Sequence, residues 1–503
     1  MSWLAARPAR KVRGLDFFRR GLAANCDRGR LPIGGKLVAA RTGTVILSRE
    51  AGIRVRGRRS HQIPVMFLSA AFSPFSTPPM AQLEGNLLVG QSGGPTSVIS
   101  ASVAGVMQEA FKHACIKEIY GGMNGIYGML REDIIDIRKE KPEDIEGLKI
   151  TPAAALGTCR YKLDFKKKAE KAAKDMDRLF EVFRAHNIRY FFYAGGNDSQ
   201  DTSHKIHLEA VKRGWEMRVI GVPKTIDNDL PHTDHCPGYG SVIKYISATT
   251  MEVGFDVGSM ATDDGSCCII EVMGRAAGWI SAGAVLAKRG QEDNPPHIIL
   301  LPEIALDEEK FLAKVKSVVE KLRYCIVIVG EGLKNKDGEE IGADKSRLDA
   351  FGHAVLAGSA DKLKEIVEGK LNLKTRTVKL GYAQRAAAHF ASLTDAEEAV
   401  ACGNAATRAA VEGKSGLMVK IVRESTSPYK WTTGLQPLED IANVEHFLPS
   451  DWISECGMMV NQKFVDYAAP LIVGETKVPM EGGLPKYVVL AKHRVAKKLA
   501  EWK

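Results

Sequence analysis

The stretch 190–199 reads Tyr-Phe-Phe-Tyr-Ala-Gly-Gly-Asn-Asp-Ser, in which an apolar run is followed by two glycines and three polar residues. The same order recurs at 219–229, where Val-Ile-Gly-Val leads into Pro-Lys-Thr-Ile-Asp-Asn-Asp. Short apolar runs that end in turn residues predict buried strands. Ligands of open α/β sheets bind beyond the carboxyl ends of the strands, so we expect both loops to contribute to one binding site.

The residues of these two loops suit the chemistry of phosphoryl transfer. Glycines let backbone N–H groups approach phosphate oxygens, and Gly196 precedes a predicted helix whose N-terminus attracts anions. If the second loop is extended, Asp227 and Asp229 point to the same side, where one can act as a base while the other orients it or meets a metal ion. The alternative for the first loop is that Asp198 or Ser199 only caps the helix.

Strands and helices alternate along the chain from residue 86 onward. Further buried strands are predicted at 86–90, 267–272, 297–301 and 324–329, and helices at 97–113, 166–185 and 199–213. This alternation predicts an α/β fold with parallel sheets. A chain of 503 residues is long enough for two or three domains.

The first 79 residues differ in composition from the rest. They hold 15 basic and 3 acidic residues, and arginine outnumbers lysine 13 to 2. Three interpretations stay open: a targeting presequence, a disordered basic arm, or a stretch outside the native coding sequence with Met80 as the true start. Met80 lies just before the first predicted strand, which favours the third interpretation.

The composition of residues 80–503 argues against several classes of protein. With 55 basic and 57 acidic residues, this part is nearly neutral, and it carries no motif for binding nucleic acid. It has no apolar run of the roughly 18 residues that a membrane helix needs. The nine cysteines of the chain show no CxxC spacing, so we expect no zinc site and a reducing, cytoplasmic location.

Four further loops carry glycines, arginines or a carboxylate, and three of them come directly after predicted strands. A glycine turn before a helix presents N–H groups to an anion, and an arginine at a strand end can clamp a phosphate with two hydrogen bonds. Each loop is weak on its own, since a turn or a solvated arginine explains it equally well. The loops are Ser92–Thr96 with Gly93 and Gly94, Met273–Arg275, Glu331, and Gly381–Arg385, with Arg376 shortly before the last.

Taken in order, the motifs SGGP, GGNDS, PKTIDND, MGR, GEG and GYAQR resemble the phosphofructokinase family, in particular its diphosphate-dependent type. The resemblance covers residues 86–407 and is less clear in the C-terminal part. It implies two Rossmann-like, three-layer α/β domains with the active site in the cleft between them. The donor-binding domain would comprise 80–240 and about 386–440, and the sugar-phosphate domain 241–385 and about 441–503.

The resemblance implies a reversible, Mg²⁺-dependent phosphoryl transfer from diphosphate to the 1-hydroxyl of fructose 6-phosphate. Asp227 corresponds to the catalytic base, with Lys224, Asp198 and Asp229 beside it. The residues that correspond to fructose 6-phosphate ligands are Thr225, Asp227, Met273, Gly274, Arg275, Glu331, Arg376, Tyr382 and Arg385. Those that correspond to diphosphate ligands are Gly93, Gly94, Arg160, Gly196 and Lys224.

Two positions indicate the phosphoryl donor. Relatives that use ATP resemble GGDGS and PGTIDND, whereas this chain has Asp198 and Lys224 in place of two of those glycines. A carboxylate at position 198 would repel the inner phosphate of a nucleotide and obstruct it. A lysine at position 224 supplies a cation that a compact diphosphate otherwise lacks.

Three positions depart from the family pattern. Asn197 replaces the usual metal-binding aspartate, and its amide oxygen can serve a metal directly or through water. Tyr382 replaces a histidine of the ATP-using relatives. Ser266 stands where many relatives have an arginine donated across a subunit interface, so sharing of the sugar-phosphate pocket in a homodimer or homotetramer is weakened or uses another residue.

Alternative functions differ in the residues that they need. An ATP-dependent phosphofructokinase, or a phosphotransferase for another sugar phosphate, would use the same base. A regulatory subunit that keeps the fold is disfavoured because the Asp227 carboxylate is present. A dinucleotide-dependent oxidoreductase is excluded, since no GxGxxG motif with a distal acidic residue occurs.

Overall fold

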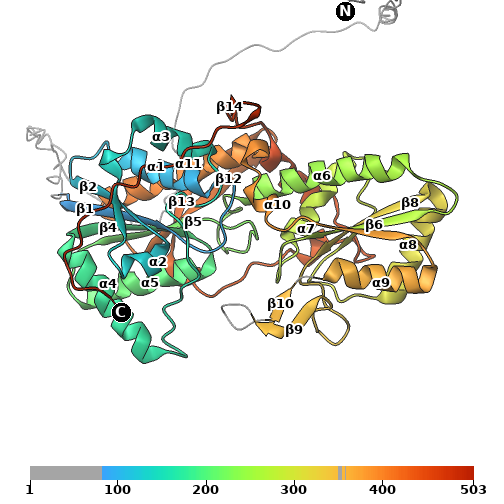
Figure 1. The fold of residues 1–503 in the computed structure, drawn as a ribbon, viewed down its shortest axis with the longest axis horizontal. Helices are drawn as coiled ribbons and strands as arrows, with labels where there is room; N and C mark the ends of the chain where they lie inside the picture. Colours follow the sequence, from blue (N-terminus) through green and yellow to red (C-terminus); the bar gives the residue numbers. More distant parts are fainter. Residues whose placement is uncertain (1–81, 349–353, 357, 503) are drawn as a thin grey trace, which may run out of the picture. The chain divides into compact units, whose positions relative to one another are not determined.

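We analysed a computed structural model, which describes residues 82–348, 354–356 and 358–502 (Figure 1). The predicted basic extension over residues 1–79 lies outside the described residues. No helix within the described residues is both long and apolar enough to cross a membrane.

The first sheet has seven strands in the order β13-β12-β5-β4-β1-β2-β3. Its five central strands are parallel, and the edge strands β3 and β13 are antiparallel to their neighbours. Leu88 of β1 lies beside Phe191 of β4, which lies beside Val219 of β5, so the predicted apolar runs pair in the centre. The strands are β1 Gly85–Gln91, β2 Ile116–Gly122, β3 Ile134–Asp136, β4 Ile188–Gly195, β5 Arg218–Pro223, β12 Leu417–Thr426 and β13 Tyr429–Pro437.

Helices cover both faces of this sheet (Figure 1). Helices α1 (Ile99–Ala110) and α11 (Leu393–Val411) pack on one face, against Leu87 and Phe192 among others. Helices α4 (Ala169–Ala185) and α5 (Asn197–Lys212) pack on the other face. Because alternate residues of a strand point to opposite faces, a strand with helices on both sides has a continuous apolar run, as β4 has at 190–194. The short helices α2 Gly125–Met129 and α3 Pro142–Gly147 complete this part.

The second sheet has four parallel strands in the order β11-β6-β8-β7. Helix α6 lies above this sheet in Figure 1, and α8 and α9 lie below it. The strands are β6 Ser266–Val272, β7 Ile298–Leu300, β8 Tyr324–Gly330 and β11 Thr375–Lys379. The helices are α6 Tyr239–Ser259, α7 Trp279–Gly283, α8 Glu308–Leu322, α9 Ser359–Leu371 and α10 Ala383–Ala386, and a hairpin of β9 Ala343–Leu348 and β10 Ala354–Leu356 follows β8. The predicted pair of three-layer α/β units is confirmed.

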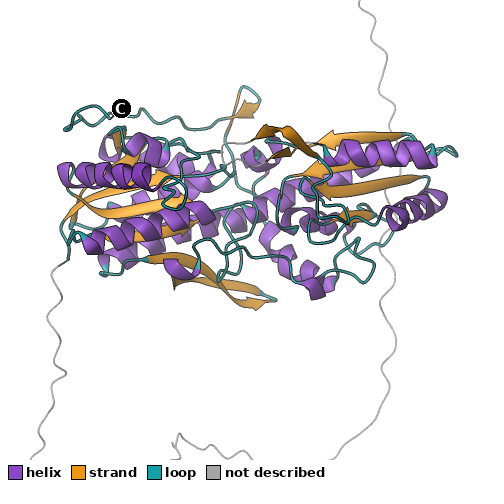
Figure 2. Cartoon of the chain, turned by 90° about the horizontal axis from the view of Figure 1, so that it is seen from below, coloured by secondary structure: helices purple, strands orange, loops and turns teal. Residues whose placement is uncertain are grey.

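The C-terminal part packs against both units. The 3-10 helix η5 (Leu438–Asp440) packs at the first sheet, whereas η6 (Ser450–Trp452) and α12 (Gln462–Ala468) pack at the second. The hairpin of β14 (Met480–Glu481) and β15 (Leu484–Pro485) follows. From there a loop, drawn in teal in Figure 2, runs to the C-terminus.

This last loop returns to the first unit, although the sequence division placed it in the second. Val488 and Leu490 pack against the core that α1 shares with the sheet, and Trp502 packs beside α4. The buried Glu140 carboxylate accepts hydrogen bonds of 2.8 and 2.7 Å from the N–H groups of Ala491 and Lys492. Hydrogen bonds to backbone groups and scattered apolar contacts hold this stretch, and neither leaves a periodic pattern in a sequence.

Candidate active site

The loop after β1 forms one side of the candidate site. Gly93 has a φ of +73°, a conformation that favours glycine, and its carbonyl accepts a hydrogen bond of 2.7 Å from Thr158. This bond, and one of 3.2 Å from the Gly93 N–H to Cys159 O, hold the segment that carries Arg160 against the loop. The predicted glycine turn and the predicted donor-side arginine are therefore neighbours.

The loop after β4 becomes the first turn of α5. The helix begins at Asn197, two residues earlier than predicted, and its N-cap Gly196 provides no side-chain cap. The exposed Asp198 carboxylate lies 2.6 Å from Lys162 Nζ. The Asn197 oxygen accepts a hydrogen bond of 2.7 Å from Asn443 N, and its amide group donates to Val444 O. The first turn of α5 thus faces a segment far along the chain.

The loop after β5 turns at Asn228 instead of running extended. Asn228 has a φ of +55°, and its side chain bonds Tyr467 Oη at 2.9 Å and Cys236 N at 2.9 Å. Asparagine tolerates this left-handed conformation better than most residues. The Asp227 N–H donates to Thr225 Oγ1 at 3.0 Å, which fixes the start of the turn. The two aspartates flank a residue whose side chain is held in place.

The Lys224 side chain crosses from the third of these loops to the first. It is buried, and its Nζ donates a hydrogen bond of 2.7 Å to Gly94 O. Burial lowers the pKa of Lys224 to about 8, although the nearby charges of Asp227 and Asp229 oppose this shift. The amine is therefore a cation that is not fully solvated, placed beneath the glycine turn.

The pKa values of two carboxylates of the site, Asp227 and Asp229, are raised. Burial and the neighbouring Glu331 raise the pKa of Asp227 to about 6, against the opposing charges of Lys224 and Arg385. Burial and Asp227 raise the pKa of Asp229 to about 7, and its buried Oδ1 has no hydrogen-bond partner among the described residues. A raised pKa makes a carboxylate a stronger base, which suits a group that takes a proton from a hydroxyl.

Residues after three strands of the second sheet form the opposite side. The Met273 N–H donates to the side-chain oxygen of Gln384 at 3.1 Å, which joins the loop after β6 to α10. Gly274 adopts a φ of +112°. Burial and Glu271 raise the pKa of Glu331, which follows β8, to about 7.

The predicted sugar-phosphate arginines differ in their surroundings. Arg385 lies over the Tyr382 ring at 4.4 Å, and its guanidinium is so close to the glycine turn that a Cβ on Gly94 would lie 2.9 Å from Nη1. Arg275 forms two hydrogen bonds, of 3.2 and 3.1 Å, with the Glu340 carboxylate. Arg385 therefore lies between the two sides, whereas Arg275 is held by a partner that the motifs do not include.

The structure brings most of the predicted residues together. Lys224, Arg160, Arg385 and Glu331 all lie near enough to Asp227 to shift its pKa through their charges. Arg376 lies elsewhere: it is exposed on the edge strand β11, beside Cys268 near the amino end of β6.

Several residues at the site were not anticipated from the motifs. The turn at Asn228 could have been predicted from the sequence, since asparagine favours the left-handed conformation. The other contacts join distant parts of the chain, and no local pattern in the sequence indicates them. These residues are Asn228, Lys162, Glu340, Tyr467 and the segment around Asn443.

Comparisons with known proteins address the family and the fold of the chain. A family model described as "Phosphofructokinase" matches residues 86–410. The chain is 46% identical over 419 residues to a pyrophosphate–fructose 6-phosphate 1-phosphotransferase of Halomonas elongata, covering 83% of this chain and 99% of the relative. For the same-named protein of Methylococcus capsulatus the identity is 44%, over 82% and 98% of the two chains. The crystal structure of a pyrophosphate-dependent phosphofructokinase from Nitrosospira multiformis superposes with a TM-score of 0.76 at 44% identity, over 83% and 100% of the two chains.

Proposed function

The chain belongs to the phosphofructokinase family, and we propose that it is a diphosphate–fructose-6-phosphate 1-phosphotransferase. It transfers a phosphoryl group from diphosphate to the 1-hydroxyl of fructose 6-phosphate, giving fructose 1,6-bisphosphate and phosphate. The observation that carries the choice of donor is the buried Lys224 amine beneath the glycine turn, 2.7 Å from Gly94 O. This cation compensates the charge of a small diphosphate, and the Asp198 carboxylate at the first turn of α5 opposes a larger nucleotide.

The residues of the site have different roles in the reaction. Asp227 takes the proton of the 1-hydroxyl as the new O–P bond forms and the bridging P–O bond of diphosphate breaks, and phosphate leaves. Lys224, Arg160 and the N–H groups of Gly94 and Gly196 compensate the charge of the donor. Positioning and charge compensation supply most of the catalysis in phosphoryl transfer.

On the second side, charged and polar groups hold fructose 6-phosphate. We assign its phosphate to arginines and its hydroxyls to the strand-end loops. The residues proposed for this role are Thr225, Met273, Gly274, Arg275, Glu331, Tyr382 and Arg385. The first unit would accordingly bind the donor and the second the sugar phosphate.

A divalent metal is part of the phosphoryl-transfer chemistry of this family, and we assign it as Mg²⁺. Within the described residues, no group of three or more His, Cys, Asp or Glu side chains is arranged to hold a metal ion. The polar residues of the candidate site therefore fit a Mg²⁺ ion that keeps several of its waters and is bound mainly through the phosphates of the substrates. Asn197 would offer its remaining lone pair, since its oxygen already accepts from Asn443 N. When bound, the metal neutralises charge on the transferred group.

We also propose a homo-oligomer in the cytoplasm. Phe255 on α6 is 76% exposed, and Met260, directly after the end of α6, is 57% exposed, so this end of the helix suits contact with a second copy. The eight cysteines within the described residues are free thiols, which suits a reducing compartment.

A donor assay tests the proposed function. Purified protein is supplied with fructose 6-phosphate, Mg²⁺ and either diphosphate or ATP, and fructose 1,6-bisphosphate is measured. We expect turnover with diphosphate and little with ATP. Comparable turnover with both, or a preference for another sugar phosphate, would contradict the assignment.

A further inference from the structure

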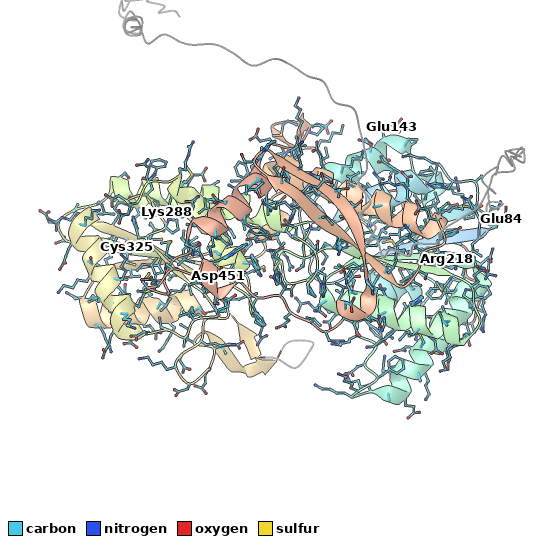
Figure 3. The ribbon with its side chains drawn as sticks, turned by 180° about the vertical axis from the view of Figure 1, so that it is seen from behind. Glu84, Glu143, Arg218, Lys288, Cys325 and Asp451 are labelled. Atoms are coloured by element: carbon cyan, nitrogen blue, oxygen red, sulfur yellow. The ribbon has the colours of Figure 1, made fainter. Side chains whose placement is uncertain are left out.

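One segment outside the family match runs along the candidate active site. Residues 443–448, Asn-Val-Glu-His-Phe-Leu, connect η5 on the first unit to η6 on the second, and we call this segment the strap. The family model ends at residue 410, so it assigns no role to the strap. The strap leads directly to η6, which contains Asp451, labelled in Figure 3.

The first end of the strap is fastened to the donor side. The Asn197 side chain accepts from Asn443 N at 2.7 Å and donates to Val444 O. The Asn443 amide also donates to the Asp201 carboxylate at 3.1 Å, one turn further along α5. Three hydrogen bonds therefore join the strap to the helix whose N-terminus is proposed to face diphosphate.

The middle of the strap is fastened to the catalytic loop and to α7. His446 N donates to Asp229 O at 2.9 Å, and His446 O accepts from Trp279 Nε1 at 2.9 Å. The His446 ring also packs on the Trp279 indole, with 5.1 Å between the ring centroids. One residue thus joins the loop of the catalytic aspartates to the helix after the sugar-phosphate loop.

The last end of the strap shares an acceptor with the start of α7. Leu448 N donates to Glu303 Oε1 at 3.3 Å, and Gly278 N donates to the same oxygen at 2.8 Å. Gly278 and Trp279 follow Met273–Arg275, the loop proposed to bind the sugar phosphate. Fully buried Trp279 cannot shift without disturbing its neighbours Trp452 and Tyr467.

We propose that the strap is a positioning element of the active site, which couples the diphosphate side to the sugar-phosphate side, with Asn197 as its anchor. This inference rests on the proposed function. In-line transfer requires the two substrates to meet in one geometry, and misplacement by about 1 Å can cost a hundredfold in rate. A segment that is hydrogen-bonded to α5, to Asp229 and to α7 fixes that geometry directly.

The test removes the strap's hydrogen bonds at one end and reads the effect at the other. Asn197→Ala loses two of the three hydrogen bonds at the donor end and leaves the one from Asn443 to Asp201. Trp279→Phe loses the bond to His446 O while keeping an aromatic ring. We expect Asn197→Ala to raise KM for fructose 6-phosphate, and Trp279→Phe to raise KM for diphosphate, each by roughly three- to thirtyfold, the range that coupled residues produce. If each variant alters KM only for the substrate on its own side, the coupling is refuted.

Asn86→Ala is the matched control. Asn86 also makes one donated and one accepted hydrogen bond, to His186 O and from Glu118 N, but it lies at the amino end of β1. We expect Asn86→Ala to lower Tm without altering KM for either substrate. If the control shows the same KM changes, then general destabilisation of the fold, and not loss of the strap's contacts, causes the changes seen in Asn197→Ala and Trp279→Phe.

A readout without turnover separates this inference from the proposed function. We expect amide hydrogen exchange at Gly278–Gly283 to be faster in Asn197→Ala than in the parent, with no change in the control. If the parent protein is inactive with diphosphate, the proposed function fails. The exchange result still shows whether the strap positions α7. Unchanged exchange at α7 would refute the strap whether or not the enzyme is active.

Asn197→Asp distinguishes an anchor from a metal ligand. Aspartate can still accept from Asn443 N, but it cannot donate to Val444 O and places a negative charge beside that carbonyl. We expect this variant to behave like Asn197→Ala. A fall in the Mg²⁺ concentration needed for half-maximal rate, with both KM values unchanged, would instead assign Asn197 to the metal and refute its anchor role.

Discussion

The Nζ atom of Lys224 donates a hydrogen bond of 2.7 Å to the carbonyl oxygen of Gly94, which joins the loop after β5 to the loop after β1. These two strands are not adjacent, since β4 lies between them. The lysine therefore reaches across the carboxyl end of β4, the edge of the sheet at which open α/β folds bind their ligands. Its charge lies beneath the turn that is proposed to hold diphosphate, and its length matches that position better than a shorter cation would.

Replacing Asp198 and Lys224 together by glycine should alter the choice of donor. The change removes the carboxylate from the first turn of α5 and the cation from beneath the glycine turn. We expect kcat/KM for diphosphate to fall by roughly 10²–10³, the scale for losing one preorganised charged donor, and turnover with ATP to become measurable. Steady-state kinetics with both donors measure this, and full diphosphate activity in the double variant would show that neither residue selects the donor.

Asp227→Asn should remove the catalytic base while preserving the shape of the site. We expect kcat to fall by roughly 10²–10⁴, with KM values close to those of the parent, since the amide keeps the contacts of the carboxylate. Asp229→Asn is the matched comparison, because its carboxylate lies next to Asp227 and shares its buried surroundings. If Asp229→Asn has the larger loss of kcat, the base is Asp229 and the roles of the two residues are exchanged.

The candidate site was largely predictable because its chemistry is carried by short, local motifs. Lys224 and Asp227 follow a buried strand directly, so their position at the carboxyl end of β5 is a consequence of the strand alone. The strands themselves were predictable because β4 and β5 are covered on both faces and each contains a continuous apolar run, at 190–194 and 219–222.

The contacts of the C-terminal part could not be predicted, for a physical reason. The strap is fastened mainly through its own backbone: Val444 O, His446 N, His446 O and Leu448 N are all main-chain atoms. Every residue type except proline offers both of these main-chain groups, so such bonds leave no mark in a sequence. The pairing of Arg275 with Glu340 joins residues 65 positions apart and is equally invisible to a local motif.

The pH dependence of kcat/KM should have two limbs. Asp227, with a pKa of about 6, must be ionised to accept a proton, and Lys224, with a pKa of about 8, must be protonated to attract diphosphate. Activity of the free enzyme should therefore rise with pH through about 6 and fall through about 8. Profiles recorded with both diphosphate and fructose 6-phosphate well below their KM values measure both limbs of the free enzyme.

Lys224→Met tests which group causes each limb. The variant should lose the fall above pH 8, and its acid limb should move to higher pH, because the lysine charge lowers the pKa of Asp227. Lys288→Met is the matched control, since Lys288 also donates to backbone carbonyls but lies in the second unit. Titration of diphosphate itself is common to all three proteins, so an alkaline limb that persists in Lys224→Met would exclude the lysine as its cause.

His235 should make the stability of the fold depend on pH. It is fully buried between two carboxylates, with Nδ1 2.7 Å from Asp234 and Nε2 2.6 Å from Glu398. Although burial opposes it, the charges of Glu398 and Asp234 raise the pKa of His235 to about 10. Because the folded state holds this proton more tightly than the unfolded chain, the stabilisation is complete below the unfolded pKa of roughly 6.5 and is lost as pH rises through about 10.

His235→Gln should abolish that dependence and lower the free energy of unfolding at pH 7. Removing one member of a buried charged network costs about 3–5 kcal/mol, because the Glu398 carboxylate stays buried without its cation, whereas Asp234 keeps its pairing with Arg423. Urea unfolding at pH 7 and at higher pH measures the effect, with His113→Gln as the control, since His113 pairs with Glu109 near the surface and should change stability by less than about 0.5 kcal/mol. If the parent and His235→Gln lose the same stability as pH rises, the histidine is neutral in the folded protein and the network is held by hydrogen bonds alone.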